Sequence, residues 1–75
     1  MNRKNVSEQI GLNIKRLRKE HKKTQEQVAE SIGISRAVYT RYENGQIEIP
    51  SSKMAAICQA LGVSASDIFD CVVVK

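Results

Sequence analysis

The sequence predicts an all-α fold: a compact domain of five short helices. Its length of 75 residues suits a single domain. In successive segments, apolar residues recur at the spacing of an amphipathic helix. Each segment ends in a short polar or glycine-containing stretch, which predicts brief turns between the helices. We place one domain over residues 1–75, with its core over about 6–69 and a tail over 70–75.

The first helix is predicted from about Ser7 to His21, with an apolar stripe made of Val6, Ile10, Ile14 and Leu17. The second helix opens at Thr24. Its hydroxyl can accept a hydrogen bond from the amide of Gln27, while the Gln27 side chain reaches back, as in a capping box. Gly33 is expected to end this helix, because glycine adopts the left-handed conformation readily.

The third helix is predicted to open at Ser35 and to end at Asn44-Gly45, with an apolar side made of Ile34, Val38, Tyr39 and Tyr42. Together with the second helix it forms a pair joined by a tight glycine turn, over about residues 24–44. This pattern is typical of a helix-turn-helix, whose second helix lies in the major groove of DNA.

The fourth helix is predicted to start at Ser51 or Ser52, because Pro50 disfavours a helical conformation in the residue before it. Its core stripe and closing glycine are Met54, Ile57, Cys58, Leu61 and Gly62. The connector before it carries Ile47 and Ile49. Two interpretations stay open for this pair, which either packs on the fourth helix or belongs to a dimer patch.

The fifth helix is predicted from a capping box in which Ser64 is the cap and Asp67 its partner, and it ends near Phe69. The tail then reads Cys71-Val72-Val73-Val74-Lys75, and three valines in a row favour a strand. A lone strand needs a partner, either in this domain or in a second subunit. Disorder of the tail is the other interpretation.

The charge distribution favours a polyanion as partner. The net charge is +4, and eight of the twelve lysines and arginines fall within residues 1–24. That segment holds only Glu8 and Glu20 as acidic residues. A basic end on a small domain is typical of nucleic-acid binding.

The third helix carries the side chains best suited to read base edges. Ser35 and Arg36 fall in its first turn, the end that contacts bases in this motif. Ala37, Thr40 and Arg41 share a face with Arg36, away from the tyrosines. Arginine pairs with guanine O6 and N7, and the methyl groups of alanine and threonine suit the thymine methyl. The residues predicted to contact the bases of double-stranded DNA are Ser35, Arg36, Ala37, Thr40 and Arg41.

A series of short motifs runs through most of the chain in a characteristic order: Ile10-Gly11, Leu17-Arg18, Thr24-Gln25, Val28-Ala29, Gly33-Ile34-Ser35, Tyr42-Glu43-Asn44-Gly45, Pro50, Leu61-Gly62-Val63 and Asp67-Ile68-Phe69. With these motifs, the segment from about Ile10 to Phe69 resembles the phage-repressor-like helix-turn-helix family, of the Xre/Cro type. The resemblance implies a lambda-repressor-like domain that regulates transcription. It also implies binding to a palindromic operator as a homodimer, and we expect a repressor.

The resemblance further implies roles for single residues. Gln25 and Asn44 are expected to bind phosphates, and Arg18 is expected to pair with Glu43 as a structural ion pair. The connector is often basic in this family, but here it reads Gln46-Ile47-Glu48-Ile49 and has no positive charge. Phosphate binding must then depend on other groups. The predicted phosphate contacts are Lys22, Lys23, Thr24, Gln25 and Asn44, with support from Arg16, Lys19 and Arg3-Lys4.

The sequence argues against an enzyme and against a metal or cofactor. His21 is the only histidine, and His21, Cys58 and Cys71 lack the spacing of zinc ligands. No phosphate-binding glycine loop, apolar signal core or membrane-spanning run is present, so we expect a cytoplasmic protein. The alternative function is an antitoxin-type or other protein-interaction module on the same fold, which would bind a toxin and its own promoter.

Overall fold

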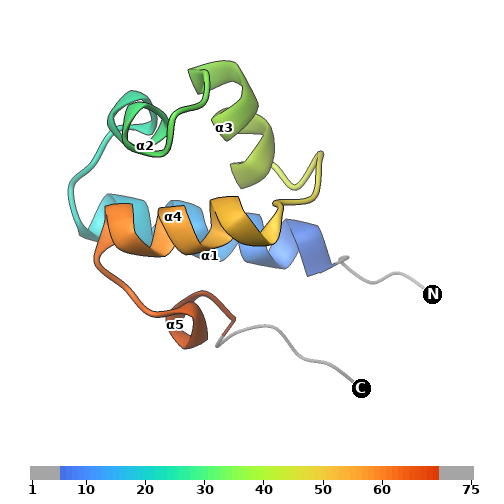
Figure 1. Cartoon of the computed structure of the whole chain (residues 1–75). Coiled ribbons are helices and arrows are strands. Elements are labelled where there is room, and N and C mark those ends of the chain that lie inside the picture. Colours follow the sequence, from blue (N-terminus) through green and yellow to red (C-terminus); the bar gives the residue numbers. More distant parts are fainter. Residues whose placement is uncertain (1–5, 70–75) are drawn as a thin grey trace.

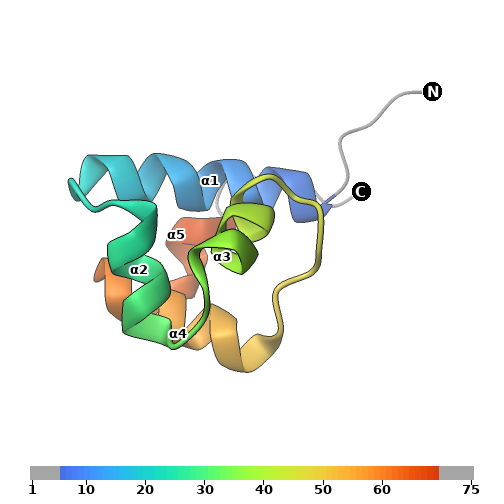
Figure 2. The ribbon, with the colours of Figure 1, turned by 90° about the horizontal axis from the view of Figure 1, so that it is seen from above.

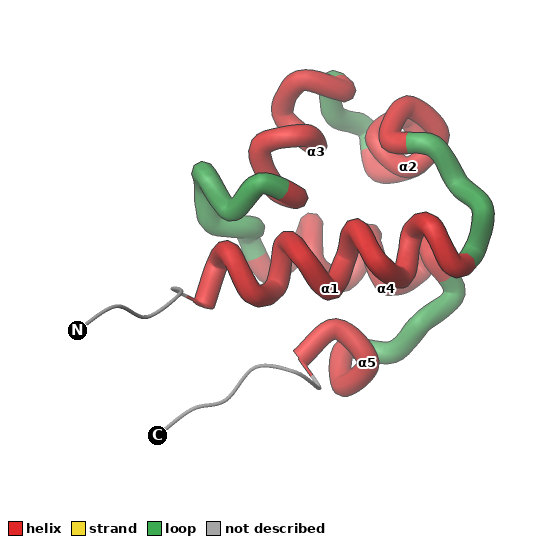
Figure 3. The backbone as a smooth tube through the Cα atoms, turned by 180° about the vertical axis from the view of Figure 1, so that it is seen from behind, coloured by secondary structure: helices red, strands yellow, loops and turns green. Residues whose placement is uncertain are grey.

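The computed structural model describes residues 6–69, and this part of the chain consists of helices joined by short loops (Figures 1 and 3). The predicted all-α fold of five helices is confirmed. The helices are α1 (Val6–Glu20), α2 (Gln25–Ile32), α3 (Arg36–Glu43), α4 (Ser51–Leu61) and α5 (Ala65–Phe69). The predictions for the tail over 70–75 and for Arg3-Lys4 fall outside the described residues.

The helices lie in three tiers. Figures 1 and 3 show α2 and α3 on one side of α1 and α4, and α5 on the other side. The helix α2 packs on α3 and α4, while α1 packs on α3 and α5. The core lies between the tiers, and its largest fully buried side chains are Tyr39, Ile14, Ile57, Leu61, Ile68 and Val28.

Local signals account for most of the helix boundaries. The capping box of α2 is present, since the Gln27 amide donates to Thr24 Oγ1 at 3.0 Å and the Thr24 amide to Gln27 Oε1 at 2.8 Å. Ser64 and Asp67 form the equivalent pair before α5, with bonds of 3.3 and 3.0 Å. Gly33 ends α2 in the left-handed conformation, with a φ of 76°. The predictions of these ends are therefore confirmed.

One expectation about the core was wrong, and one core residue was not foreseen. Val6, the first residue of the predicted stripe of α1, is half exposed at the N-terminal end of the helix. Asn13, a polar residue for which the sequence predicts no role, is buried on α1. Its Nδ2 donates to the carbonyl oxygen of Ile68 at 2.6 Å, which joins α1 to α5. This bond satisfies a carbonyl near the end of a helix too short to pair all its own groups.

Gly11 brings α1 against the C-terminal end of α3. A Cβ atom at this position would lie only 2.6 Å from the carbonyl oxygen of Tyr42, and it would also collide with the carbonyl group of Glu43. Both groups are backbone and cannot rotate away. The absence of a side chain at Gly11 is therefore what allows the two helices to approach this closely.

We expect Gly11→Ala to lower the free energy of unfolding, because the added methyl group must push α3 away from α1. Overpacking of this kind costs about 1–3 kcal/mol. Urea denaturation followed by circular dichroism measures the change, with Lys15→Ala on the exposed side of the same helix as the control. A Gly11→Ala protein as stable as that control would contradict the close approach.

Candidate nucleic-acid interface

The helix α3 is divided into a buried and an exposed side. Tyr39 and Tyr42 are buried, and their rings meet edge to face with centroids 6.5 Å apart. Arg36, Ala37 and Arg41 are exposed to solvent. We call these three residues the outward face of α3. The tyrosines anchor the helix from behind, so its exposed side chains are presented on a fixed support.

The other two predicted base-contacting residues already make hydrogen bonds within the protein. Ser35 caps α3, and its Oγ accepts from the amide of Val38 at 3.2 Å. The hydroxyl of Thr40 is half-buried and lies 2.9 Å from the carbonyl oxygen of Arg36 and 3.0 Å from Gln25 Oε1. Neither hydroxyl is as freely presented as the arginines of the outward face.

Gln25 links the start of α2 to α3. Its Oε1 accepts from Thr40, and its Nε2 donates to Glu43 Oε1 at 3.0 Å. These contacts hold the N-terminal turn of α2 beside the middle of α3. An amide side chain has two N–H groups, so one of them is not used by Glu43.

Arg18 and Glu43 form a buried, two-pronged ion pair. Arg18 Nε lies 2.6 Å from Glu43 Oε2, and its Nη2 lies 3.2 Å from Oε1. The third guanidinium nitrogen, Nη1, donates to the carbonyl oxygen of Lys23 at 2.8 Å. The pair thus joins α1, the turn after it and the end of α3. The structure brings together the two residues that the resemblance paired.

The environment of this pair affects the ionisation of its members and of a neighbouring tyrosine. Burial raises the pKa of the Glu43 carboxyl, but hydrogen bonds from Arg18 and Gln25 outweigh this effect and hold the pKa below its usual value. The hydrogen bond to Glu43 raises the pKa of Arg18. Burial, with the Glu43 carboxylate close by, also raises the pKa of Tyr39. The carboxylate and the guanidinium therefore stay charged at neutral pH.

The residues predicted to bind phosphates lie at the two ends of the α2–α3 pair. Lys22, Lys23 and Thr24 are exposed in the turn before α2, where Lys22 has a left-handed backbone with a φ of 58°. Asn44 is exposed at the C-terminal end of α3. Figure 2 shows this turn and the connector after α3 on opposite sides of the molecule.

The other cationic side chains differ in whether they already bond to another group of the protein. Arg16 pairs with Glu20 at 3.0 Å on the surface of α1. Lys53 donates to the carbonyl oxygen of Ile32 at 3.2 Å and so joins α4 to α2. Lys15 is exposed and lines a shallow hollow together with Asn44. Lys15 lies one helical turn after Gly11, the residue at which α1 meets the end of α3. This spacing is the signal from which the place of Lys15 near the end of α3 could have been inferred.

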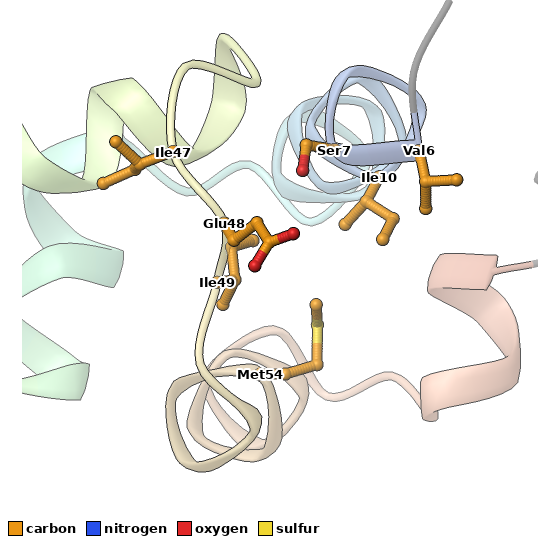
Figure 4. Close-up of a pocket in the computed structure, with 7 residues that line it drawn as sticks. All are labelled: Val6, Ser7, Ile10, Ile47, Glu48, Ile49 and Met54. Atoms are coloured by element: carbon orange, nitrogen blue, oxygen red, sulfur yellow. The ribbon is translucent and has the colours of Figure 1, made fainter.

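The two isoleucines of the connector between α3 and α4 differ in burial. Ile49 packs against the core, whereas Ile47 is 37% exposed. Packing on the core therefore accounts for Ile49, whereas Ile47 points away from Ile10 and Met54 (Figure 4) and keeps over a third of its surface exposed. Every helix between residues 6 and 69 falls short of the length and apolarity that a membrane span requires, and the same residues contain no cluster of three or more potential metal ligands.

Comparison with known proteins identifies the family. The model of a family described as Helix-turn-helix matches residues 14–68. Antitoxin PezA of Streptococcus pneumoniae is 48% identical over 59 residues, which are 79% of this chain and 37% of that protein. The chain thus spans little more than a third of the length of this curated relative.

Solved structures share the fold. The clp gene regulator ClgR from Corynebacterium glutamicum superimposes with a TM-score of 0.89 and 26% identity, over 92% of this chain and 73% of that chain. The restriction-modification controller protein C.AhdI from Aeromonas hydrophila gives a TM-score of 0.79 at 22% identity, over 83% and 94% of the two chains.

Because the pKa of Glu43 is lowered in the folded protein, we expect acid to remove the stability that the ion pair provides. The unfolded chain takes up a proton at Glu43 near its ordinary pKa of 4.5, before the folded chain does. The stability is therefore fully present above that pH and is lost as the pH falls toward the folded pKa. Unfolding free energies of the protein and of Glu43→Gln, measured from neutral to acidic pH, should converge as the pH falls.

A constant difference between the two proteins across this range would contradict the assignment. If Glu43→Gln does not fold, NMR titration of the Glu43 carboxyl carbon in the unaltered protein gives the same answer, since its midpoint should lie below 4.5.

Proposed function

The chain belongs to the helix-turn-helix family of DNA-binding transcription regulators, and from that premise we propose that it binds a specific site on double-stranded DNA with α3 in the major groove. The observation that carries the proposal is the outward face of α3. Two arginines and an alanine are exposed on a helix whose opposite side is anchored by two buried tyrosines. A rigid, exposed helix with long donors is what reading of base edges requires.

We assign base contacts within this face as follows. Arg36, in the first turn, donates to guanine O6 and N7, and Arg41 does the same five residues later. Ala37 packs against a thymine methyl group. Ser35 and Thr40 already make bonds within the protein, so they contact bases only at the edge of the site.

Phosphate contacts on either side of α3 fix its register on the DNA. At one end we assign them to Lys22, Lys23 and Thr24, and to Gln25 through its first-turn backbone amide and its second Nε2 hydrogen. Amides at the start of a helix suit anions because they have no partner within the helix. At the other end we assign a contact to Asn44, which lines one hollow with Lys15 and with the carboxylates of Glu8 and Glu43.

We further propose that the protein acts as a repressor in the cytoplasm, as a homodimer on a palindromic operator. Two copies related by a two-fold axis would present their α3 helices to half-sites about 34–36 Å apart. A second reading rests on the 48% identity with antitoxin PezA, in which case the same domain would also serve a protein partner. Co-purification of an untagged protein with this chain would favour that reading.

For the base contacts, we expect Arg36→Ala to weaken binding to the specific site far more than binding to unrelated DNA. The site is first obtained by selection from random DNA. Loss of one bidentate arginine–guanine pair costs about 1–3 kcal/mol of discrimination. Lys23→Ala is the matched control, because loss of a phosphate contact should weaken both kinds of binding alike. If Arg36→Ala weakens binding to the specific site and to unrelated DNA equally, as measured by fluorescence anisotropy at one salt concentration, Arg36 is removed from the base-contacting set.

For the dimer, we expect two chains per operator. Analytical ultracentrifugation of the complex on the selected site should give a ratio of two to one, and halving the site should leave one chain bound with weaker affinity. A ratio of one to one on a site with clear two-fold symmetry would rule out the homodimer while leaving the major-groove contacts intact.

A further inference from the structure

Thr40 lies at the border between the outward face of α3 and the helix α2. It follows Arg36 by about one helical turn and directly precedes Arg41, so it adjoins the exposed side of α3. Its side chain is half-buried beside Gln25 of α2, and part of it stays accessible to solvent. What Thr40 can offer to DNA therefore depends on which parts of its hydroxyl group the protein already uses.

The single hydrogen of this hydroxyl group is held inside the protein. A threonine hydroxyl has one hydrogen to donate and two lone pairs that accept. Oγ1 of Thr40 lies 2.9 Å from the carbonyl oxygen of Arg36 and 3.0 Å from Oε1 of Gln25. Both partners are acceptors, so one of them takes the hydrogen and neither uses a lone pair of Oγ1. Donation to a base would require the hydroxyl to give up both internal acceptors.

The orientation of the Gln25 amide follows from its other neighbour. A side-chain amide has an oxygen that accepts and a nitrogen that donates, and turning the group over exchanges the two. Glu43 is a carboxylate paired with Arg18 and can only accept, so the amide nitrogen must face it, at 3.0 Å. The amide oxygen is then fixed toward Thr40. The ion pair thus determines, through Gln25, that Thr40 meets an acceptor rather than a donor.

We propose that Thr40 determines specificity as a hydrogen-bond acceptor and selects a base with an exocyclic amino group, adenine or cytosine; the proposal rests on the proposed function, in which α3 lies in the major groove. The amino groups of adenine and cytosine are the donors that base pairs display there, whereas guanine and thymine present acceptors. The lone pairs of Thr40 match the first two bases only. Arg36 and Arg41 only donate and match guanine, so α3 presents both polarities to the groove.

Selection of bound sites from random DNA with three proteins tests the identity of the base. The unaltered chain should select adenine or cytosine at one position of the site, and Thr40→Ser, which keeps the hydroxyl, should retain that preference. Thr40→Val has nearly the same shape but no hydroxyl, so it should lose the preference at this position. Its preferences at the other positions should remain, which shows that the variant folds and binds DNA in the same register.

A base analogue then identifies the atom. At the position that depends on Thr40, purine replaces adenine or pyrimidinone replaces cytosine, so that only the exocyclic amino group is removed. We expect the unaltered chain to lose about 3- to 10-fold in affinity, the typical contribution of one hydrogen bond. Thr40→Val should lose much less. Any effect of the analogue on the DNA itself is common to the two proteins, so the difference between them reports the contact with Thr40.

Several outcomes would overturn the proposal while a specific site, and with it the proposed function, remains. Guanine or thymine at the position that depends on Thr40 would mean that the hydroxyl donates. An equal loss of affinity for both proteins on the analogue would mean that the amino group is not what Thr40 contacts. Selection of one and the same site by Thr40→Val and the unaltered chain would exclude a base contact by the hydroxyl. If no site is selected at all, the proposed function fails and the role of Thr40 fails with it.

Discussion

The buried ion pair between Arg18 and Glu43 holds the parts of the candidate DNA interface in one arrangement. Arg18 comes from α1 and also binds the carbonyl oxygen of Lys23 in the turn before α2. Glu43 is the last residue of α3 and also accepts a hydrogen bond from Gln25. The turn that carries the basic residues, the start of α2 and the helix proposed to read bases are therefore connected through two side chains. Removing one partner of such a pair leaves a buried charge, which typically costs about 3–5 kcal/mol. In a domain of this size that is a large share of the total stability.

Much of the fold could be predicted because its signals are local. The capping box at Thr24 and the turn at Gly33 each depend on residues within one helical turn, and both have the expected geometry. Asn13 and Gly11 could not be read in this way. Asn13 bonds to a residue 55 positions away, and Gly11 is required by a helix that begins 25 residues later. No pattern within α1 indicates what those distant elements will place against it.

The candidate site was predictable in part for the same reason. The exposed side of α3 follows from helical spacing alone, so Arg36 and Arg41 could be placed on the surface from the sequence. The hydrogen bonds that occupy Gln25 and Thr40 join two helices and could not be foreseen. Family membership narrows the chemistry to DNA binding, but a fold shared by regulators of different processes does not identify the target. That information resides in the few exposed side chains of α3.

The bond from Asn13 to Ile68 has a consequence for how the protein is made. The helix α5 has five residues, too few to be stable without the surface of α1 and α4 on which it packs. Its partner Asn13 is synthesised 55 residues earlier. The first helices leave the ribosome with their apolar side uncovered. The side-chain amide of Asn13, which is buried in the complete fold, is then still in contact with water. The core closes only when α5, the last described helix, has packed on α1 and α4, so assembly cannot be completed helix by helix.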